Sequence, residues 1–314
     1  MSGELHVIFG TGPVGCWTAR ALRQRGRAVR VVNRTGRRPA LLPADVEIVK
    51  ADAADPAQAA AVTEGASVVY QAMNPPYHEW AQRFPALQAG ALAAARSAGA
   101  AYVSIENLYP YDASRPITED APVAPRSRKG EVRRRMAEEV LAAHQRGEVR
   151  TTALRASDYY GPGVVDSALG GMVIGNLVAG KKAQIAGSAT QPHSFAYVED
   201  VGRAAAALGT SGQALGKAWL APHAPALTQG AMVAEACRVL GIPPKLTVIS
   251  PLMMRLAGLF VPGARETVEM MYEFTEPFVV DASHSERTFG LAATPIPEGI
   301  ARTVAWFRER ALTG

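Results

Sequence analysis

Cysteine is scarce in this sequence, with Cys16 and Cys237 the only two among 314 residues. Two cysteines cannot form the disulfide framework that stabilises small secreted domains, so we expect a reducing compartment. Aromatic residues are also few, at 7%, which leaves aliphatic side chains and alanine to form most of the core. A hydrophobic fraction of 48% and a charged fraction of 19% nevertheless describe a globular protein.

Long apolar runs are missing as well. The longest one near the end, residues 251–262, is interrupted by Arg255, whereas a membrane helix needs about 20 apolar residues. The segment ahead of the first predicted strand has no basic region, apolar stretch and cleavage site in series. We therefore expect a cytoplasmic protein without a membrane segment. The length suits one large α/β domain, or a nucleotide-binding domain with a smaller partner.

A glycine-rich turn follows the first predicted strand. The apolar run at residues 5–9 is typical of a buried parallel strand, and a helical pattern begins shortly after it. The intervening glycines fit G-x-G-x-x-G: Gly10 permits the tight turn, Gly12 lets the backbone approach a pyrophosphate, and Gly15 allows close helix packing. The N-terminus of the helix offers N–H groups to phosphate. We therefore predict that a dinucleotide binds at Gly10, Gly12, Pro13, Val14 and Gly15.

A carboxylate is absent where this kind of turn normally needs one. The second predicted strand, residues 28–32, ends at Asn33 and Arg34. An NAD site carries Asp or Glu there, to bond the ribose 2′-hydroxyl. A carboxylate would repel a 2′-phosphate, whereas arginine can pair with it through two hydrogen bonds. The sequence therefore favours NADP(H) over NAD(H), bound at this end by Asn33 and Arg34.

Strands and helices alternate through the first half of the chain. Strands are predicted at residues 46–49, 67–72, 101–105 and 149–154, and helices at about 80–97 and 130–145. Asp52 follows the third strand and Asn74 the fourth, so both belong to the carboxyl edge where such sheets bind ligands, and we assign both to the cofactor site. The predicted fold class is α/β, a Rossmann-like doubly wound parallel sheet with a smaller, mixed C-terminal substrate-binding part.

The pattern changes after the sixth strand. Residues 168–179 have a helical pattern, short strands are predicted at 184–187 and 245–250, and Asp200 and Thr228 are candidate helix starts. We divide the chain into an NADP-binding domain, residues 1–165, and a mainly substrate-binding part, residues 166–314. No flexible linker separates them. We expect the second part to pack on the first around a cleft, with some of its segments returning to the first domain.

Four segments of the chain form a set. They are the glycine turn, Asp52, residues 155–163 (RASDYYGPG) and residues 194–201 (SFAYVEDV). As a set they resemble the extended, epimerase/dehydratase-like branch of the short-chain dehydrogenase/reductase superfamily, over almost the whole chain. The resemblance implies an NAD(P)-dependent oxidoreductase, epimerase or dehydratase that acts on a small carbonyl or hydroxyl substrate.

The tyrosine on which that superfamily relies is absent. Its members use a Tyr-x-x-x-Lys pair on the helix after the fifth strand, in which the tyrosine exchanges a proton and the lysine lowers its pKa. By the superfamily's spacing these positions fall on Lys129 and Arg133, and residues 113–154 contain no tyrosine. The serine position falls on Ile105, next to Ser104. We expect Lys129 to take part in proton transfer and Arg133 to bind ribose hydroxyls or a phosphate.

Further candidates lie at the same sheet edge. Tyr109 and Ser104 complete the predicted catalytic set with Lys129, while Glu106 and Asn107 are additional acid/base candidates. Tyr159 and His193 are predicted to bind the substrate. We predict no metal site.

Two classes of function follow from the missing pair. The first is an enzyme with a non-standard acid/base set, which we favour because the segments around Tyr160 and Tyr197 are suited to shaping a substrate cleft. The second is a catalytically silent NADP(H) sensor or interaction module that uses the basic helix around Arg134 and Arg135. A small-molecule substrate is the expected partner and a homodimer the assembly we consider, whereas the net charge of +5 favours nucleic acid only weakly.

Overall fold

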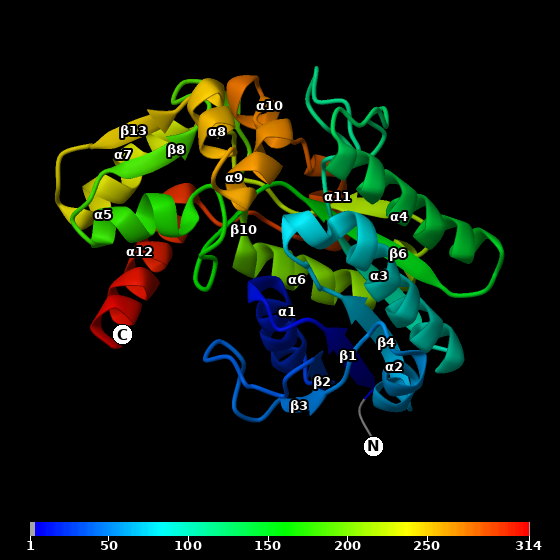
Figure 1. Cartoon of the computed structure of the whole chain (residues 1–314). Coiled ribbons are helices and arrows are strands. Elements are labelled where there is room, and N and C mark those ends of the chain that lie inside the picture. The colour runs from blue at the N-terminus through cyan, green and yellow to red at the C-terminus, as the bar shows by residue number, and fades with distance from the viewer. Residues whose placement is uncertain (1–3, 314) are drawn as a thin grey trace.

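A seven-stranded parallel sheet forms the centre of the molecule (Figure 1). The structure is a computed structural model, and it describes residues 4–313. The strand order is β11-β6-β5-β4-β1-β2-β3, and every neighbouring pair is parallel. Its strands are β1 (Leu5–Phe9), β2 (Ala28–Asn33), β3 (Glu47–Lys50), β4 (Ala66–Gln71), β5 (Ala101–Asn107), β6 (Thr151–Ala156) and β11 (Ala218–Leu220).

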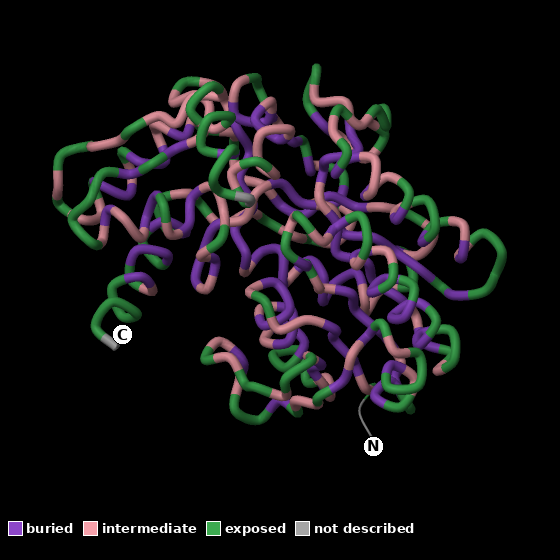
Figure 2. Tube along the Cα trace, viewed as in Figure 1, coloured by how far each residue is buried: buried purple, intermediate pink, exposed green. Residues whose placement is uncertain are grey.

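Helices cover both faces of the sheet, because its strands are apolar on both sides. On one face, α1 (Pro13–Gln24) and α6 (Val198–Gly209) enclose a core with Ile8, Val31 and Val103. On the other, α2 (Pro56–Thr63), α3 (Trp80–Ser97) and α4 (Arg128–Gln145) pack against Val69 and Tyr102. Figure 2 shows the buried residues concentrated between these layers. The predicted α/β doubly wound sheet is confirmed.

The remaining elements build the second part of the molecule. Its short strands are β7 (Tyr159–Tyr160), β8 (Ala183–Ala186), β9 (Pro192–His193), β10 (Ala196–Tyr197), β12 (Leu227–Thr228) and β13 (Leu246–Ile249). Its helices are α5 (Asn176–Val178), α7 (Gln229–Leu240), α8 (Pro251–Ala257), α9 (Pro262–Thr267), α10 (Tyr272–Thr275), α11 (Ser283–Phe289) and α12 (Ile296–Thr313). Single turns occur in both parts: η1 (Tyr77–Glu79) precedes α3 and η3 (Gly212–Ala214) follows α6, whereas η2 (Gly170–Gly175) and η4 (Val268–Met270) lie in the second part.

The two parts of the molecule share elements. The second part has its own core around Leu177, Ile185, Val233 and Phe307. However, α6 and β11 lie beyond residue 165 in sequence and still belong to the central sheet and its covering layer. The division of the chain at residue 165 stays a prediction. After this residue, the chain returns to the first part of the molecule to form α6 and β11.

The strand order creates a crevice at one edge of the sheet. From β1 the chain builds outward through β2 and β3, and then through β4, β5, β6 and β11 on the other side. Loops that leave the carboxyl ends of β1 and β4 therefore separate, and ligands of such sheets bind between them. This crevice positions the candidate site.

One predicted helix has a different form. A helical pattern was predicted over residues 168–179, and the structure has the π-helical turn η2 at Gly170–Gly175 followed by the three α-helical residues of α5. The predicted helix is therefore present, with a π-helical first part in which two glycines lie in close contacts. A Cβ on Gly170 would lie 2.1 Å from the carbonyl oxygen of Val165, and one on Gly175 would lie 3.2 Å from the ring of Phe307.

The start of α6 was also predicted two residues too late, because it begins at Val198 rather than Asp200. The predicted start at Thr228 is confirmed, since its hydroxyl accepts from the N–H of Ala231 and caps α7. Among the described residues, no helix has the length and apolar character needed to cross a membrane.

Candidate active site

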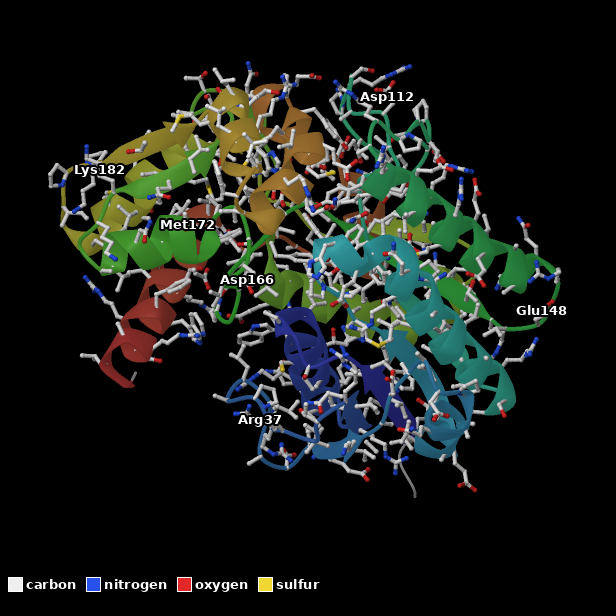
Figure 3. The ribbon with its side chains drawn as sticks, viewed as in Figure 1. Arg37, Asp112, Glu148, Asp166, Met172 and Lys182 are labelled. Atoms are coloured by element: carbon white, nitrogen blue, oxygen red, sulfur yellow. The ribbon has the colours of Figure 1, made fainter. Side chains whose placement is uncertain are left out.

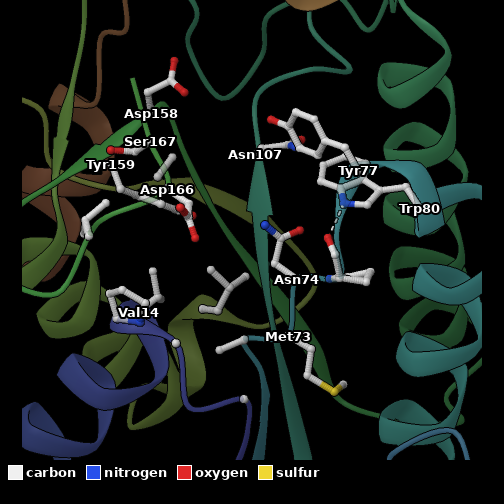
Figure 4. Close-up of a pocket in the computed structure, with 18 of the residues that line it drawn as sticks. Val14, Met73, Asn74, Tyr77, Trp80, Asn107, Asp158, Tyr159, Asp166 and Ser167 are labelled. Carbon is white, nitrogen blue, oxygen red and sulfur yellow. Dashed lines mark hydrogen bonds between the residues drawn. The ribbon is translucent and has the colours of Figure 1, made fainter. Parts of the chain in front are cut away.

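A large cavity occupies the crevice at the carboxyl edge of the sheet. Its volume is about 1220 Å³, and it continues from the turn after β1 to residues of the second part of the molecule. Asp166, on the loop after β7, lies between the two parts in Figure 3. Figure 4 shows Asn74 between two walls, with Asp158, Tyr159 and Ser167 on one side and Tyr77 and Trp80 on the other.

The glycine turn after β1 forms one end of the cavity. Gly10 has a φ of +116°, and a Cβ there would lie 2.5 Å from the carbonyl oxygen of Ala72. A Cβ on Gly15 would lie 2.1 Å from the carbonyl oxygen of Gly10, so α1 can approach the turn only with glycine at this position. A Cβ on Gly12 would meet no atom within 4 Å, and no side chain caps α1 at this residue. The open space beside an uncapped helix N-terminus fits a pyrophosphate.

The predicted cofactor residues divide into two groups. Gly10, Gly12, Pro13, Val14, Asn33, Arg34, Asn74 and Arg133 line the cavity, whereas Gly15 and Asp52 do not. Gly15 acts through the packing of α1. Asp52 is used locally, because its Oδ1 accepts from the N–H of Ala54 at 3.0 Å.

Asn33 and Arg34 lie at the end of β2 with different roles. The Oδ1 of Asn33 accepts from the N–H groups of Thr35 and Gly36, at 3.0 and 2.6 Å. Its Nδ2 donates to the hydroxyl of Thr11 at 3.1 Å. Asn33 therefore shapes the loop and joins it to the glycine turn, while the exposed side chain of Arg34 stands on the cavity wall.

Lys129 is not on the cavity wall, although its sequence position suggested proton transfer. Its Nζ donates to Oε2 of Glu266 and to Oε1 of Glu269, both at 2.7 Å, and to the carbonyl oxygen of Glu266 at 3.0 Å. The side chain is 4% exposed. Lys129 therefore joins the start of α4 to α9 and η4, an arrangement that favours a structural role over proton transfer.

Arg133, one turn further along α4, does line the cavity. Its Nη2 donates to the carbonyl oxygen of Ile105 at 3.2 Å, and its guanidinium lies 4.6 Å from the ring centre of Phe84. Burial lowers its pKa from the ordinary value for arginine, although a guanidinium remains charged in proteins. Within the described part of the chain, its buried Nε has no hydrogen-bond partner. An unused donor at this depth fits a ribose hydroxyl.

Of the two other predicted catalytic residues, Tyr109 lines the cavity and Ser104 does not. Ser104 is buried in β5 and does not line the cavity. Tyr109 lines the cavity, and its hydroxyl is 2.6 Å from that of Tyr77. Burial raises the pKa of Tyr109 well above its ordinary value, so the phenol can donate a hydrogen bond but is a poor base at neutral pH.

Tyr159 lines the cavity as predicted for a substrate-binding residue, and burial raises its pKa to about 12. His193, the other predicted substrate-binding residue, is buried behind the wall. Its Nε2 lies 2.9 Å from Oδ2 of Asp158, and its Nδ1 lies 3.0 Å from the carbonyl oxygen of Glu273. The structure thus connects His193 to the cavity through Asp158.

Sequence reasoning missed Asp158 and Glu273, which both line the cavity. Asp158 lies in the segment 155–163 that carries the family resemblance, but no catalytic or binding role was predicted for it. Glu273 lies within the otherwise apolar residues 270–274, MMYEF. An acidic residue in such a run was the signal that could have identified it, because a buried carboxyl outside an ion pair often marks a functional site.

Comparisons with known proteins agree with this geometry. The model of the NAD dependent epimerase/dehydratase family matches residues 7–219. No curated protein is significantly similar to the chain in sequence.

Several solved structures have the same fold. A UDP-glucuronic acid 4-epimerase from Bacillus cereus, in complex with NAD, has a TM-score of 0.80 at 15% identity, covering 98% of this chain and 99% of that one. PA4631, a nucleoside-diphosphate-sugar epimerase from Pseudomonas aeruginosa, has a TM-score of 0.78 at 18% identity, with 98% of each chain covered. MoeE5, in complex with UDP-glucose and NAD, has a TM-score of 0.76 at 22% identity, covering 98% of this chain and 100% of that one.

These likenesses establish the architecture, and the family match extends over more than half of the sequence. The match includes the glycine turn, the strand ends that carry Asn33 and Asn74, and the start of α4. This chain belongs to the NAD-dependent epimerase/dehydratase family.

Proposed function

We propose that this protein is an NADP(H)-dependent oxidoreductase or epimerase/dehydratase-type enzyme that acts on a small carbonyl or hydroxyl substrate without the usual tyrosine. The observation that carries the proposal is a single cavity that joins the dinucleotide turn at Gly12 to the titratable side chains of Tyr109, Asp158 and Glu273. A protein that only sensed the cofactor would not need buried acid/base groups beyond it. The bound nicotinamide would supply hydride exchange, and the chain's own residues would orient the substrate and handle its proton.

The residues on the wall suggest how the cofactor is held. The turn at Gly10, Gly12 and Val14 suits the pyrophosphate, and Arg133 suits a ribose. NAD in the complexes of the Bacillus cereus epimerase and MoeE5 supports a nicotinamide dinucleotide. Arg34, at a position where an NAD site carries a carboxylate, supports NADP(H).

The side chains that the second part of the molecule contributes to the cavity wall bear on the substrate class. The structural neighbours include enzymes that act on nucleotide sugars, among them the UDP-glucuronic acid 4-epimerase. In this chain, the wall beyond Tyr159 carries Asp166, Ser167, Met172 and Ile249. Arg310 is the single cationic residue that the described residues after position 165 contribute to this wall. One cation compensates little of the charge of a diphosphate, so we favour a smaller carbonyl or hydroxyl compound.

The alternative of a silent interaction module depends on a free basic surface on α4. Arg134 instead pairs with Glu131 and Glu138, Arg135 pairs with Glu131, and Arg126 pairs with Glu276. Because acidic side chains neutralise these arginines locally, this surface gives little support to a nucleic-acid partner.

Exchange of Arg34 for aspartate tests the cofactor preference. A hydrogen bond to a charged group contributes about 1.5–3 kcal/mol, so Arg34→Asp should weaken NADPH binding at least tenfold and leave NADH binding nearly unchanged. Arg37→Asp is the matched control, because Arg37 is also exposed but does not line the cavity. Protein fluorescence titrations measure both affinities. Equal affinity of the wild type for NADH and NADPH would contradict the preference.

Turnover separates the enzyme from the sensor. NADPH oxidation should be measured with a panel of aldehydes, ketones, enones and nucleotide sugars. We expect turnover with a small carbonyl compound. Tight NADPH binding with no oxidation by any member of the panel would favour the sensor.

A further inference from the structure

A buried glutamate of α10 belongs to the cavity wall. Glu273 lines the cavity, although only 2% of the residue is exposed to solvent. Its Oε1 has no hydrogen-bond partner within the described part of the chain. Burial, together with the charge of Asp158 nearby, raises the pKa of Glu273 well above its ordinary value. Such surroundings favour the protonated form of a carboxyl group, which can act as an acid.

Asp158 and His193 lie next to it and contact each other. The Nδ1 of His193 lies 3.0 Å from the carbonyl oxygen of Glu273. A carbonyl oxygen only accepts, so Nδ1 carries a hydrogen. The Nε2 of the same ring lies 2.9 Å from Oδ2 of Asp158. The hydroxyl of Ser157 also lies 3.4 Å from Nε2, so the histidine ring is held from both of its nitrogens.

Aromatic packing fixes the histidine ring in this position. The ring stacks on Phe274 and on Phe278, with centroids 5.2 Å apart in both cases, and also contacts Phe195 at 4.4 Å. Phe274 follows Glu273 on α10, and Phe278 pairs with His193 through a β-bridge. The backbone of Glu273 and the ring of His193 are thus held as one unit, while the side chain of Asp158 connects that unit to the cavity.

We propose that Glu273 is the proton-exchanging residue of this site. The proposal rests on the proposed function and identifies its acid/base group. As the Oε–H bond of Glu273 breaks, an O–H bond forms at an anionic oxygen of the substrate. The Glu273 carboxylate then regains a proton from water. In the opposite direction, the Glu273 carboxylate removes the proton of a substrate hydroxyl.

In this proposal, Glu273 takes over the proton transfer that the superfamily assigns to the tyrosine missing at position 129. Lys129, at the tyrosine position, is bound to Glu266 and Glu269, and residues from α10 occupy the cavity wall instead. The titratable groups around Glu273 come from several elements: Tyr77, Tyr109, Asp158, His193 and Tyr272.

Infrared spectroscopy of the protein without cofactor tests the protonation directly. A protonated carboxyl group has a C=O stretch separate from the bands of carboxylates. We expect this band at pH 7 in the wild type and in Glu266→Gln, and its loss in Glu273→Gln. Its absence from the wild type at pH 7 would overturn the proposal. In Asp158→Asn the band should titrate at a lower pH, because the negative charge that disfavours ionisation of Glu273 is gone. An unchanged titration would contradict the coupling.

Kinetics then test the role in turnover. Glu273→Gln should bind NADPH within about twofold of the wild type, whereas its turnover on the substrate found by the panel should fall by roughly a hundredfold or more. Full turnover by this variant would overturn the inference and leave the proposed function intact. Failure of the wild type to bind NADPH would contradict the proposed function, and the infrared band would still show whether Glu273 holds a proton.

Discussion

Lys129 lies where α4 meets the segment of Glu266 and Glu269, and its ammonium group is nearly inaccessible to water. Two carboxylates and a carbonyl oxygen satisfy its three hydrogens. Burial of an ammonium group is costly unless it is paired in this way, and removing one partner leaves an uncompensated charge. Lys129 therefore holds the start of α4 against α9 and η4.

Replacement of Lys129 by methionine should reduce stability more than cofactor binding. Because Glu266 and Glu269 are 26% and 27% exposed, we expect a loss of roughly 1–3 kcal/mol, less than for a fully buried pair. Urea denaturation measures this loss, with the exposed Lys182→Met as the control. NADPH affinity should change less than twofold. A variant with wild-type stability and strongly reduced turnover would instead restore Lys129 as a catalytic residue.

Some site residues could be predicted because a local pattern determines them. Gly12, Arg34 and Asn74 follow strand ends, and the carboxyl ends of parallel strands meet at one edge. Glu273 could not be placed from sequence, because α10 reaches the cavity through contacts with residues about 80 positions earlier, such as His193. For Lys129, the spacing gave the position on α4 but not the acidic partners contributed by η4 and α9.

At the scale of elements, the β1–α1 turn depends on two glycines for different reasons. Gly15→Ala would place a methyl group against the carbonyl oxygen of Gly10 and force α1 outward, so we expect a loss of about 1–3 kcal/mol of stability together with weaker NADPH binding. Gly12→Ala has open space around the new methyl group. It should keep wild-type stability and weaken NADPH binding alone, because the methyl group takes the place of the pyrophosphate.

Urea denaturation and fluorescence titration of the two variants separate these effects. Equal loss of stability in both would argue against the distinction. Wild-type NADPH affinity in Gly12→Ala would show that the pyrophosphate lies elsewhere.

Elements of the first half could be predicted well because strand and helix periodicities are strong there. The strand Leu5–Phe9 and the helix Trp80–Ser97 have the predicted bounds. In the second half, most strands have two to four residues and are stabilised by long-range pairing, such as β13 with β8. The helical pattern at Gly170–Gly175 was predicted, but not its π-helical form or its close approach to Val165 and Phe307, because a periodicity contains no long-range contacts.

For the whole molecule, buried histidines predict sensitivity to mild acid. Burial lowers the pKa of His6 and that of His223 to about 4, compared with about 6.5 in an unfolded chain. Between these values the unfolded chain binds more protons, so stability falls as the pH decreases from about 6.5 to 4. Each histidine contributes at most about 1.4 kcal/mol per pH unit.

Urea denaturation at several pH values checks this expectation. His6→Gln should have a shallower dependence of stability on pH over that range, whereas the control His78→Gln, at an exposed position, should follow the wild type. An unchanged slope in His6→Gln would contradict the assignment.

The path of the chain between the two parts also constrains how such a protein can be divided or recombined. An exchange of everything after residue 165 would remove the edge strand β11 and the helix α6 together with the substrate-binding surface. The fragment left behind would have an unpaired strand, β6, and an uncovered apolar face, both of which promote aggregation. New substrate specificity in this architecture is therefore accessible through substitutions in the loops around the cavity, and not through the transfer of a C-terminal module.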